Sequence, residues 1–105
     1  MSRLRMTIPR EQLEDFCRRW QIVELAFFGS VLRDDFGPES DVDLLVRFAP
    51  EVSWTLMDHV AMEDELRQIF GREVDLVTRR GIERSRNALR RKGILESAEV
   101  YYAAA

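Results

Sequence analysis

The sequence Phe27-Phe28-Gly29-Ser30, followed after ten residues by Asp41-Val42-Asp43-Leu44-Leu45-Val46, decides the fold. Residues 22–28 are rich in β-branched and aromatic side chains and stop at a glycine, which is typical of a buried strand ending in a tight turn. Residues 41–48 predict a second strand, because an apolar run follows the charged start. The ten residues between the two motifs predict a short helical piece and then a loop.

Further elements are predicted on both sides of this stretch. Apolar residues at helical spacing, preceded by a proline in the first turn, indicate an N-terminal helix. A longer helix should end at Gly71, which is placed as its C-terminal cap. The order of elements predicts an α/β or α+β domain, with a small mixed β-sheet flanked by helices. The predicted ranges are helix 9–20, helix 53–70, strand 73–78, and helix 81–92 interrupted at Gly93, with the type of 94–102 left open.

Size and composition indicate one folded domain. The 105 residues suffice for one hydrophobic core, so we expect a single domain over 1–105, ending in a disordered Ala103-Ala104-Ala105 tail. No apolar run approaches the ~20 residues that span a bilayer, and no signal-peptide pattern is present. Cys17 is the only cysteine, so an internal disulfide is excluded and thiolate metal ligation is disfavoured. We expect a cytoplasmic location and no membrane contact.

Two aspartates stand at the start of the second predicted strand. Because side chains alternate along a strand, Asp41 and Asp43 should point to the same face, about 7 Å apart. Two carboxylates at one site repel each other unless a cation lies between them, and hard oxygen ligands suit Mg²⁺. We therefore expect a metal site, the alternative being an exposed strand start with a capping loop.

Three other residues extend this site. Gly29 lets the backbone approach a ligand, and Ser30 adds a hydroxyl donor, so the pair predicts a phosphate-binding turn; an ordinary turn serine is the alternative. Asp75 is a charge inside the apolar strand 73–78. On a neighbouring strand it would complete the metal site and accept a proton, although an exposed edge-strand aspartate is also possible.

These parts together match the needs of phosphoryl-group chemistry. Such chemistry uses metal ions on the attacking and leaving oxygens, hydrogen-bond donors around the phosphates, and a base for the nucleophile. We therefore expect in-line displacement at the α-phosphorus of a nucleotide, with pyrophosphate as the leaving group.

The motif Gly29-Ser30-x10-Asp41-x-Asp43 resembles the defining motif of the DNA polymerase β-like nucleotidyltransferase superfamily. The surrounding residues, and those around Asp75, resemble its minimal nucleotidyltransferase (MNT) branch, over roughly residues 20 to 102. The resemblance implies the polymerase β-like fold, with the three aspartates as catalytic Mg²⁺ ligands. It also implies that the glycine and serine contact the phosphates of the nucleotide substrate, ATP.

The MNT resemblance further implies a biological role. Members of this branch are commonly antitoxins that transfer AMP from ATP to a tyrosine of a HEPN-domain ribonuclease toxin, with which a hetero-oligomer is expected. A chain of 105 residues has little room for a separate acceptor domain, which agrees with an acceptor on a partner protein. Two alternatives stay open: nucleotidyl transfer to a small molecule such as an antibiotic, and an antitoxin that neutralises by binding alone.

Basic residues are concentrated near the C-terminus although the net charge is −3. The segment from Arg79 to Lys92 holds seven of the sixteen basic residues and one acid, Glu83. A solvated helix face, phosphate contacts, and docking to an acidic partner or nucleic acid are all compatible with it. Direct nucleic-acid binding is disfavoured, because no recognition-helix pattern accompanies the basic run.

Several other side chains allow two interpretations. Arg33 follows the phosphate-binding turn and could contact nucleotide or partner, or pair with Asp34 or Asp35. Of the remaining candidates, the histidine is expected to be a packing or surface residue rather than a catalytic base, and the tyrosines to be packing residues. The tryptophans are expected to be core or partner-facing anchors rather than base-stacking groups. These candidates are His59, Trp20, Trp54, Tyr101 and Tyr102.

Overall fold

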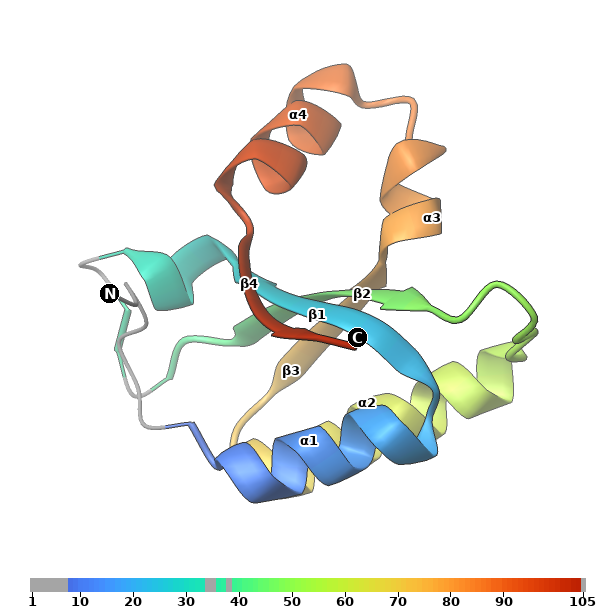
Figure 1. Ribbon diagram of the computed structural model, residues 1–105. Helices are drawn as coiled ribbons and strands as arrows, with labels where there is room; N and C mark the ends of the chain where they lie inside the picture. The colour runs from blue at the N-terminus through green and yellow to red at the C-terminus, as the bar shows by residue number, and fades with distance from the viewer. Residues whose placement is uncertain (1–7, 34–35, 38, 105) are drawn as a thin grey trace.

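The sheet at the centre of the molecule has four strands in the order β3-β2-β1-β4. The computed structural model describes residues 8–33, 36–37 and 39–104. β1 runs antiparallel to both β2 and β4, whereas β2 and β3 are parallel. The predicted small mixed sheet flanked by helices is thereby confirmed (Figure 1). The strands are β1 (Ile22–Phe28), β2 (Val42–Phe48), β3 (Val74–Thr78) and β4 (Glu99–Ala103).

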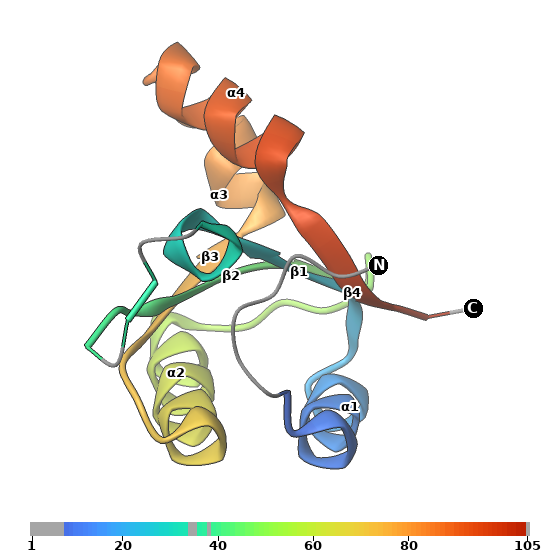
Figure 2. The same ribbon diagram turned by 90° about the vertical axis from the view of Figure 1, so that its left-hand side faces the viewer.

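Helices cover both faces of this sheet (Figures 1 and 2). α1 (Arg10–Arg19) and α2 (Leu56–Phe70) lie against one face. α3 (Arg79–Glu83) and α4 (Ala88–Ser97) lie over the other. A short 3-10 helix, η1 (Gly29–Leu32), directly follows β1. α2 is the crossover that two parallel strands, β2 and β3, require.

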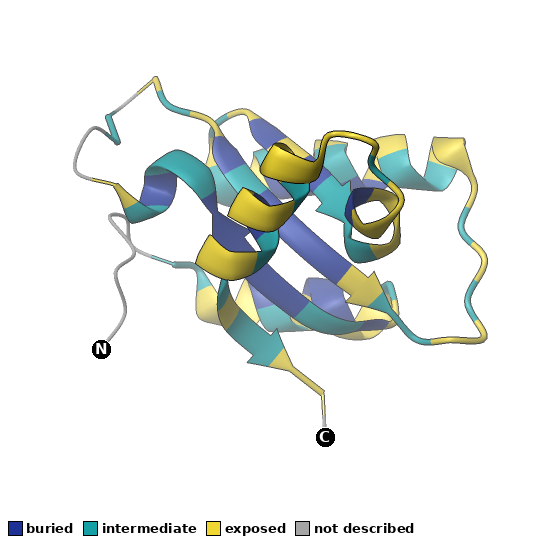
Figure 3. Ribbon diagram, turned by 90° about the horizontal axis from the view of Figure 1, so that it is seen from above, coloured by how far each residue is buried: buried dark blue, intermediate teal, exposed yellow. Residues whose placement is uncertain are grey.

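Alternation along β2 divides the apolar side chains between the two faces. Val42, Leu44 and Val46 belong to the main core, together with α1 and α2 residues such as Phe16. Leu45 belongs to a smaller cluster beneath α3 and α4, whose other buried members are Ala26, Phe28, Ile82 and Ile94. Seen from above, the outer surface of α4 is exposed while the strands beneath it are buried (Figure 3). Among the described residues, no helix is both long and apolar enough to cross a membrane.

α2 has both of its ends fixed by local hydrogen bonds. Thr55 and Asp58 form a capping box at the N-terminus, where Thr55 Oγ1 accepts the Asp58 N–H at 3.2 Å. Gly71 ends the helix with φ 70°, a left-handed conformation that glycine adopts without a Cβ clash. The predicted glycine cap is confirmed, and the helix begins a few residues later than predicted because the capping box lies at 55.

The predicted break at Gly93 is wrong. α4 continues through Gly93, and the basic segment is instead divided between Glu83 and Ala88. A glycine inside a helix costs only about 1 kcal/mol relative to alanine, so it need not end the helix. Asn87 decides the boundary, because its side chain accepts the Arg90 N–H at 3.0 Å and caps the N-terminus of α4.

The C-terminal residues form an edge strand rather than a tail. Ala103 lies in β4 opposite Glu24, and the Ala104 N–H donates to the Val23 carbonyl at 2.8 Å. The expectation of disorder is therefore wrong for these two alanines, while Ala105 lies outside the described residues. Backbone pairing explains the difference, since it does not depend on side-chain character.

Candidate functional site

Two of the predicted aspartates face each other on neighbouring strands. Asp43 of β2 and Asp75 of β3 are direct Cα partners in the parallel register. Asp43 is half-buried and Asp75 is exposed on the edge strand. Asp41 is exposed one residue before β2, and the intervening Val42 is buried on the opposite face. The strand register therefore brings together carboxylates that lie more than thirty residues apart in the sequence.

The surroundings of the Asp43 carboxyl disfavour its ionised form. Burial raises its pKa above the ordinary value, and the charges of Asp75 and Asp41 raise it further. The backbone N–H of Ser30, which donates to the carboxylate, and the charge of Arg33 act in the opposite direction. A half-buried carboxyl whose ionised form is disfavoured by burial and by neighbouring carboxylates is a recognised sign of a functional site.

Gly29 sits where only a glycine fits. Its φ is 75°, and a Cβ at this position would overlap Oδ2 of Asp43. β1 ends at Phe28, which is the antiparallel partner of Asp43, so the turn passes directly beside the carboxylate. Ser30 Oγ donates to the Asp41 carbonyl oxygen at 3.2 Å. The glycine–serine turn therefore positions the start of β2 in addition to any contact with a ligand.

An open cleft of about 420 Å³ lies above the carboxylate pair. We call it the carboxylate cleft. Its lining residues are Phe28, Gly29, Arg33, Asp43, Asp75, Arg90, Gly93, Ile94 and Ser97. The lining therefore combines two guanidinium groups with two carboxylates. Such a cleft suits an anion, for example a phosphate group, that binds together with a cation. Arg33 lines the cleft, in agreement with the ligand-contact interpretation, and its alternative partners Asp34 and Asp35 lie outside the described residues.

The contribution of α4 was not predicted from the sequence. Arg90, Gly93, Ile94 and Ser97 come from this helix and face the cleft. They are spaced i, i+3, i+4 and i+7, which places them on one side of a helix. That spacing is visible in the sequence, but only the fold shows that this side of the helix covers the carboxylates.

The donor set fits a hard divalent cation that is shared with a substrate. Within residues 8–33, 36–37 and 39–104, no three His, Cys, Asp or Glu side chains are grouped closely enough to hold a metal ion by themselves. The facing carboxylates of Asp43 and Asp75 offer oxygen ligands without a closed cage. Mg²⁺ is commonly held in this way, by one or two carboxylates, water and the phosphates of a substrate.

The aromatic residues outside the site pack as predicted. Trp20 and Trp54 meet edge to face, with ring centroids 5.1 Å apart, and Trp54 Nε1 donates to the Trp20 carbonyl at 3.1 Å. Tyr101 packs edge to face on Phe27 with centroids 5.7 Å apart. Tyr102 is partly buried against the main core. All four residues pack against the main core.

Two remaining candidates also lie away from the carboxylates. His59 of α2 has Nε2 3.8 Å from a carboxylate oxygen of Glu63, on the sheet face opposite α3 and α4. Cys17 is fully buried in the main core, and burial raises the pKa of its thiol to about 12. A thiol in this state is poorly suited to bind a metal ion.

Two sequence relatives are named as protein adenylyltransferases. "Protein adenylyltransferase MntA" of Thermococcus cleftensis is 33% identical over 72 residues, 69% of this chain and 68% of that protein. "Putative protein adenylyltransferase MJ1379" of Methanocaldococcus jannaschii is 30% identical over 64 residues, 61% of this chain and 64% of that protein. This second alignment therefore spans just under two thirds of the relative.

Solved structures share the fold. One described as "Structure of putative minimal nucleotidyltransferase" has a TM-score of 0.65 and 36% identity, covering 86% of each chain. Another, "Crystal structure of the toxin-antitoxin with AMP-PNP", has a TM-score of 0.71 over 92% of this chain and 75% of that one. Its identity is 14%, so the likeness shows the fold alone. The family model described as "Nucleotidyltransferase domain" matches residues 9–101, and the chain belongs to this family.

Proposed function

We propose that this protein is a Mg²⁺- and ATP-dependent protein adenylyltransferase of the cytoplasm. It transfers AMP to a tyrosine of a HEPN-type ribonuclease toxin and thereby acts as the antitoxin. The observation that carries the proposal is the facing pair of Asp43 and Asp75 beside the Gly29-Ser30 turn. The names of the sequence relatives support adenylyl transfer, and a toxin–antitoxin complex of similar fold supports the choice of partner.

ATP is expected to bind in the carboxylate cleft. Gly29 lines the cleft beside the Asp43 carboxylate, and Ser30 supplies a hydroxyl next to Asp41. Arg33, which follows η1, and Arg90 of α4 both line the cleft and offer positive charge for the phosphate oxygens. The cleft is open, so the end of the nucleotide that reacts stays accessible to a protein acceptor.

Asp41, Asp43 and Asp75 are the residues that would hold Mg²⁺. When bound, Mg²⁺ polarises the phosphoryl oxygens and neutralises charge that develops on the leaving group. The pair of Asp43 and Asp75 is well placed for a cation, because neutralisation of their charges relieves the repulsion that, after burial, contributes to the raised pKa of Asp43. Asp41 lies outside the cleft lining and would approach as a third ligand.

The reaction itself is an in-line displacement. The tyrosine oxygen attacks the α-phosphorus while the bond from that phosphorus to the bridging oxygen of the β-phosphate breaks. Pyrophosphate leaves with the bonding electrons, and the phenolic proton passes to the Asp75 carboxylate. Asp75 suits this role because it is the more exposed member of the pair and lies on the edge strand, where an acceptor protein reaches it.

The test is the mass of the partner. The purified protein is mixed with the HEPN-type product of a neighbouring gene as the candidate toxin, ATP and MgCl₂, and intact-protein mass spectrometry is used to detect added AMP. We expect one or more AMP additions, which are absent when EDTA is added or when Asp43→Asn and Asp75→Asn are combined.

The alternatives give different results in the same experiment. Toxin neutralisation without any added AMP, unchanged in the double variant, would indicate an antitoxin that acts by binding alone. Pyrophosphate release that needs an aminoglycoside instead of the partner would indicate a small-molecule nucleotidyltransferase.

A further inference from the structure

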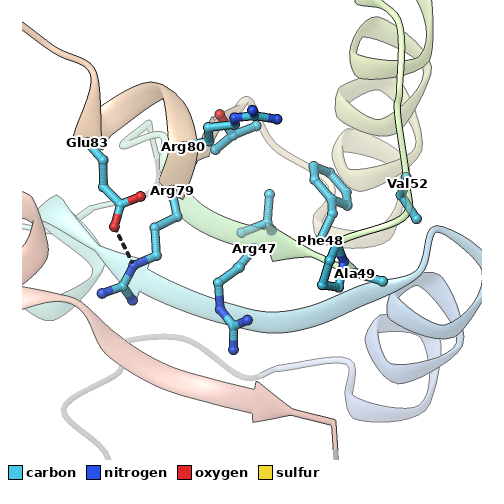
Figure 4. Close-up of a pocket in the computed structure, with 10 residues that line it drawn as sticks. Arg47, Phe48, Ala49, Val52, Arg79, Arg80 and Glu83 are labelled. Carbon is cyan, nitrogen blue, oxygen red and sulfur yellow. Dashed lines mark hydrogen bonds and ion pairs between the residues drawn. The ribbon is translucent and has the colours of Figure 1, made fainter.

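A second hollow lies at the edge of the sheet where β2 and β3 end (Figure 4). Its volume is about 360 Å³. It is lined by Val46, Arg47, Phe48, Ala49, Pro50, Val52, Thr78, Arg79, Arg80 and Glu83. We call this hollow and its extension described below the arginine groove. None of its lining residues takes part in the proposed adenylyl transfer.

Strand alternation places Arg47 of the groove on the same face as Asp43, whereas Val46 and Phe48 point to the opposite face. Along β2, Asp43, Leu45 and Arg47 point the same way, and Leu45 lies in the cluster beneath α3 and α4. The parallel partner of Leu45 is Val77, which packs against the same cluster. Asp43 and Arg47 are four residues apart, so about 13 Å of strand separates the carboxylates from the start of the groove. A protein bound in the groove therefore lies within reach of the carboxylate cleft.

The arginines of the groove differ in their pairing. Arg79 pairs with Glu24 at 3.2 Å and with Glu83 at 3.4 Å, and Arg47 approaches Glu24 at 3.9 Å. Arg80 is exposed and takes part in no ion pair among the described residues. In Figure 4, Arg79 turns toward Glu83 while Arg80 extends toward Phe48 and the loop that carries Val52. The groove therefore presents one uncompensated guanidinium above an apolar floor.

The groove continues toward the start of α2. A smaller hollow of about 200 Å³ shares Phe48, Val52, Thr78 and Arg80 with the first and reaches Thr55 and His59. Directly after Thr55 in the chain, Leu56 and Met57 are 78% and 74% exposed. Large apolar side chains this exposed, next to an apolar hollow, are typical of a surface that another protein covers.

We propose that the arginine groove docks an acidic segment of the acceptor protein, with apolar side chains on its floor and a carboxylate on Arg80. This proposal rests on the proposed function, because it takes the acceptor to be a protein. The positive charge of Arg80 favours an acidic partner. The apolar lining favours contact with the apolar side chains of a protein over contact with the phosphate backbone of a nucleic acid. Nucleic acid would require an extended cationic surface, whereas here Glu24 and Glu83 already neutralise part of the arginine charge.

A matched pair of charge reversals tests the groove. Arg80→Glu and Arg86→Glu change the net charge equally and lie in the same basic segment, but only Arg80 lines the groove. Both arginines are exposed, so neither change should unfold the protein. Titration calorimetry with the toxin, in the presence of AMP-PNP and without turnover, is expected to show at least about tenfold weaker binding for Arg80→Glu only.

Kinetics separate docking from chemistry. For Arg80→Glu we expect a raised KM for the toxin, with kcat and the KM for ATP unchanged. If the wild-type protein adds no AMP but Arg80→Glu still weakens toxin binding selectively, the docking proposal is supported and the proposed adenylyl transfer is contradicted. Equal weakening by both variants, no weakening by either, or selective loss of binding to a labelled oligonucleotide instead of the toxin would overturn the docking proposal.

Discussion

The carboxylate cleft lies near the start of β2 and β3, the arginine groove lies where both strands end, and the two sites balance their charges in opposite ways. In the cleft, Asp43 and Asp75 face each other, and their repulsion helps raise the pKa of Asp43. In the groove, Arg79 lies within ion-pair distance of two glutamates, and only Arg80 is left over. An arrangement of like charges that costs free energy indicates a ligand that restores the balance. In the groove most of the arginine charge is neutralised by glutamates, and among the described residues only the charge of Arg80 is not. Such a surface indicates a docking site, where a single ion pair favours one partner over others.

The largest expected effect comes from removing one charge of the cleft. Asp43→Asn should lower the rate of AMP transfer by at least about 10³-fold, because the metal site and the phosphate charge balance are lost together. Asp64→Asn, the same change at an exposed aspartate of α2 that lines neither the cleft nor the groove, should leave the rate unchanged. Both rates are measured as AMP-modified toxin under saturating ATP. Equal activity of Asp43→Asn and wild type would contradict the assignment of the cleft.

Gly29→Ala should have the next largest effect. The new Cβ would collide with the Asp43 carboxylate, and the left-handed backbone adds a cost of about 1–2 kcal/mol. We expect activity to fall about 10²-fold, together with a lower melting temperature. Gly37→Ala is the control, since nothing lies within 4 Å of a Cβ at that position and its φ is not positive. A Gly29→Ala variant that keeps full activity would show that the turn does not position Asp43.

Arg90→Ala tests the part of the cleft that α4 provides. Loss of a charge-assisted contact to phosphate should raise the KM for ATP about tenfold. Lys92→Ala, also exposed on α4 but outside the cleft lining, serves as the control. Steady-state kinetics with varied ATP distinguish the two variants. An equal KM for ATP in the two variants would contradict a role of Arg90 in nucleotide binding.

The smallest expected effect is a gain in stability. Because the pKa of Asp43 is raised on folding, the folded protein binds this proton more tightly than the unfolded chain does. The stabilisation by this group is therefore present at low pH and is lost as pH rises through the folded pKa. Asp43→Asn should raise the melting temperature at pH 7 in Mg²⁺-free buffer, and the gain should disappear below the unfolded pKa of about 3.9. A lower melting temperature at pH 7 would show that the carboxylate is stabilising when ionised.

The sequence predicted the carboxylate end of the sheet well because its signals are local. The apolar run that ends at Gly29, and the alternation of Asp41 and Asp43 with Val42, follow from rules that act over a few residues. The structure agrees with both strands and with the α2 cap at Gly71. The roles of the three aspartates as metal ligands remain predictions that the experiments above test.

The parts that were missed depend on contacts between distant residues. Arg90 lines the cleft only because α4 packs over the strands that carry Asp43 and Asp75. Short-range sequence patterns do not predict that packing. The strand at Ala103 forms because an edge of β1 is available for backbone pairing, which alanine does not oppose. Arg47 belongs to a groove only once β2, β3 and α3 have been placed together.

Transfer of a labelled phosphate tests the central claim most directly. The toxin is incubated with the protein, Mg²⁺ and ATP labelled with ³²P at either the α- or the γ-phosphate, and the protein-bound label is counted after gel electrophoresis. Adenylyl transfer at the carboxylate cleft predicts label on the toxin from the α-phosphate only, with the γ-label recovered in pyrophosphate. Toxin labelled from the γ-phosphate, or α-labelling that persists when Asp43→Asn and Asp75→Asn are combined, would contradict it.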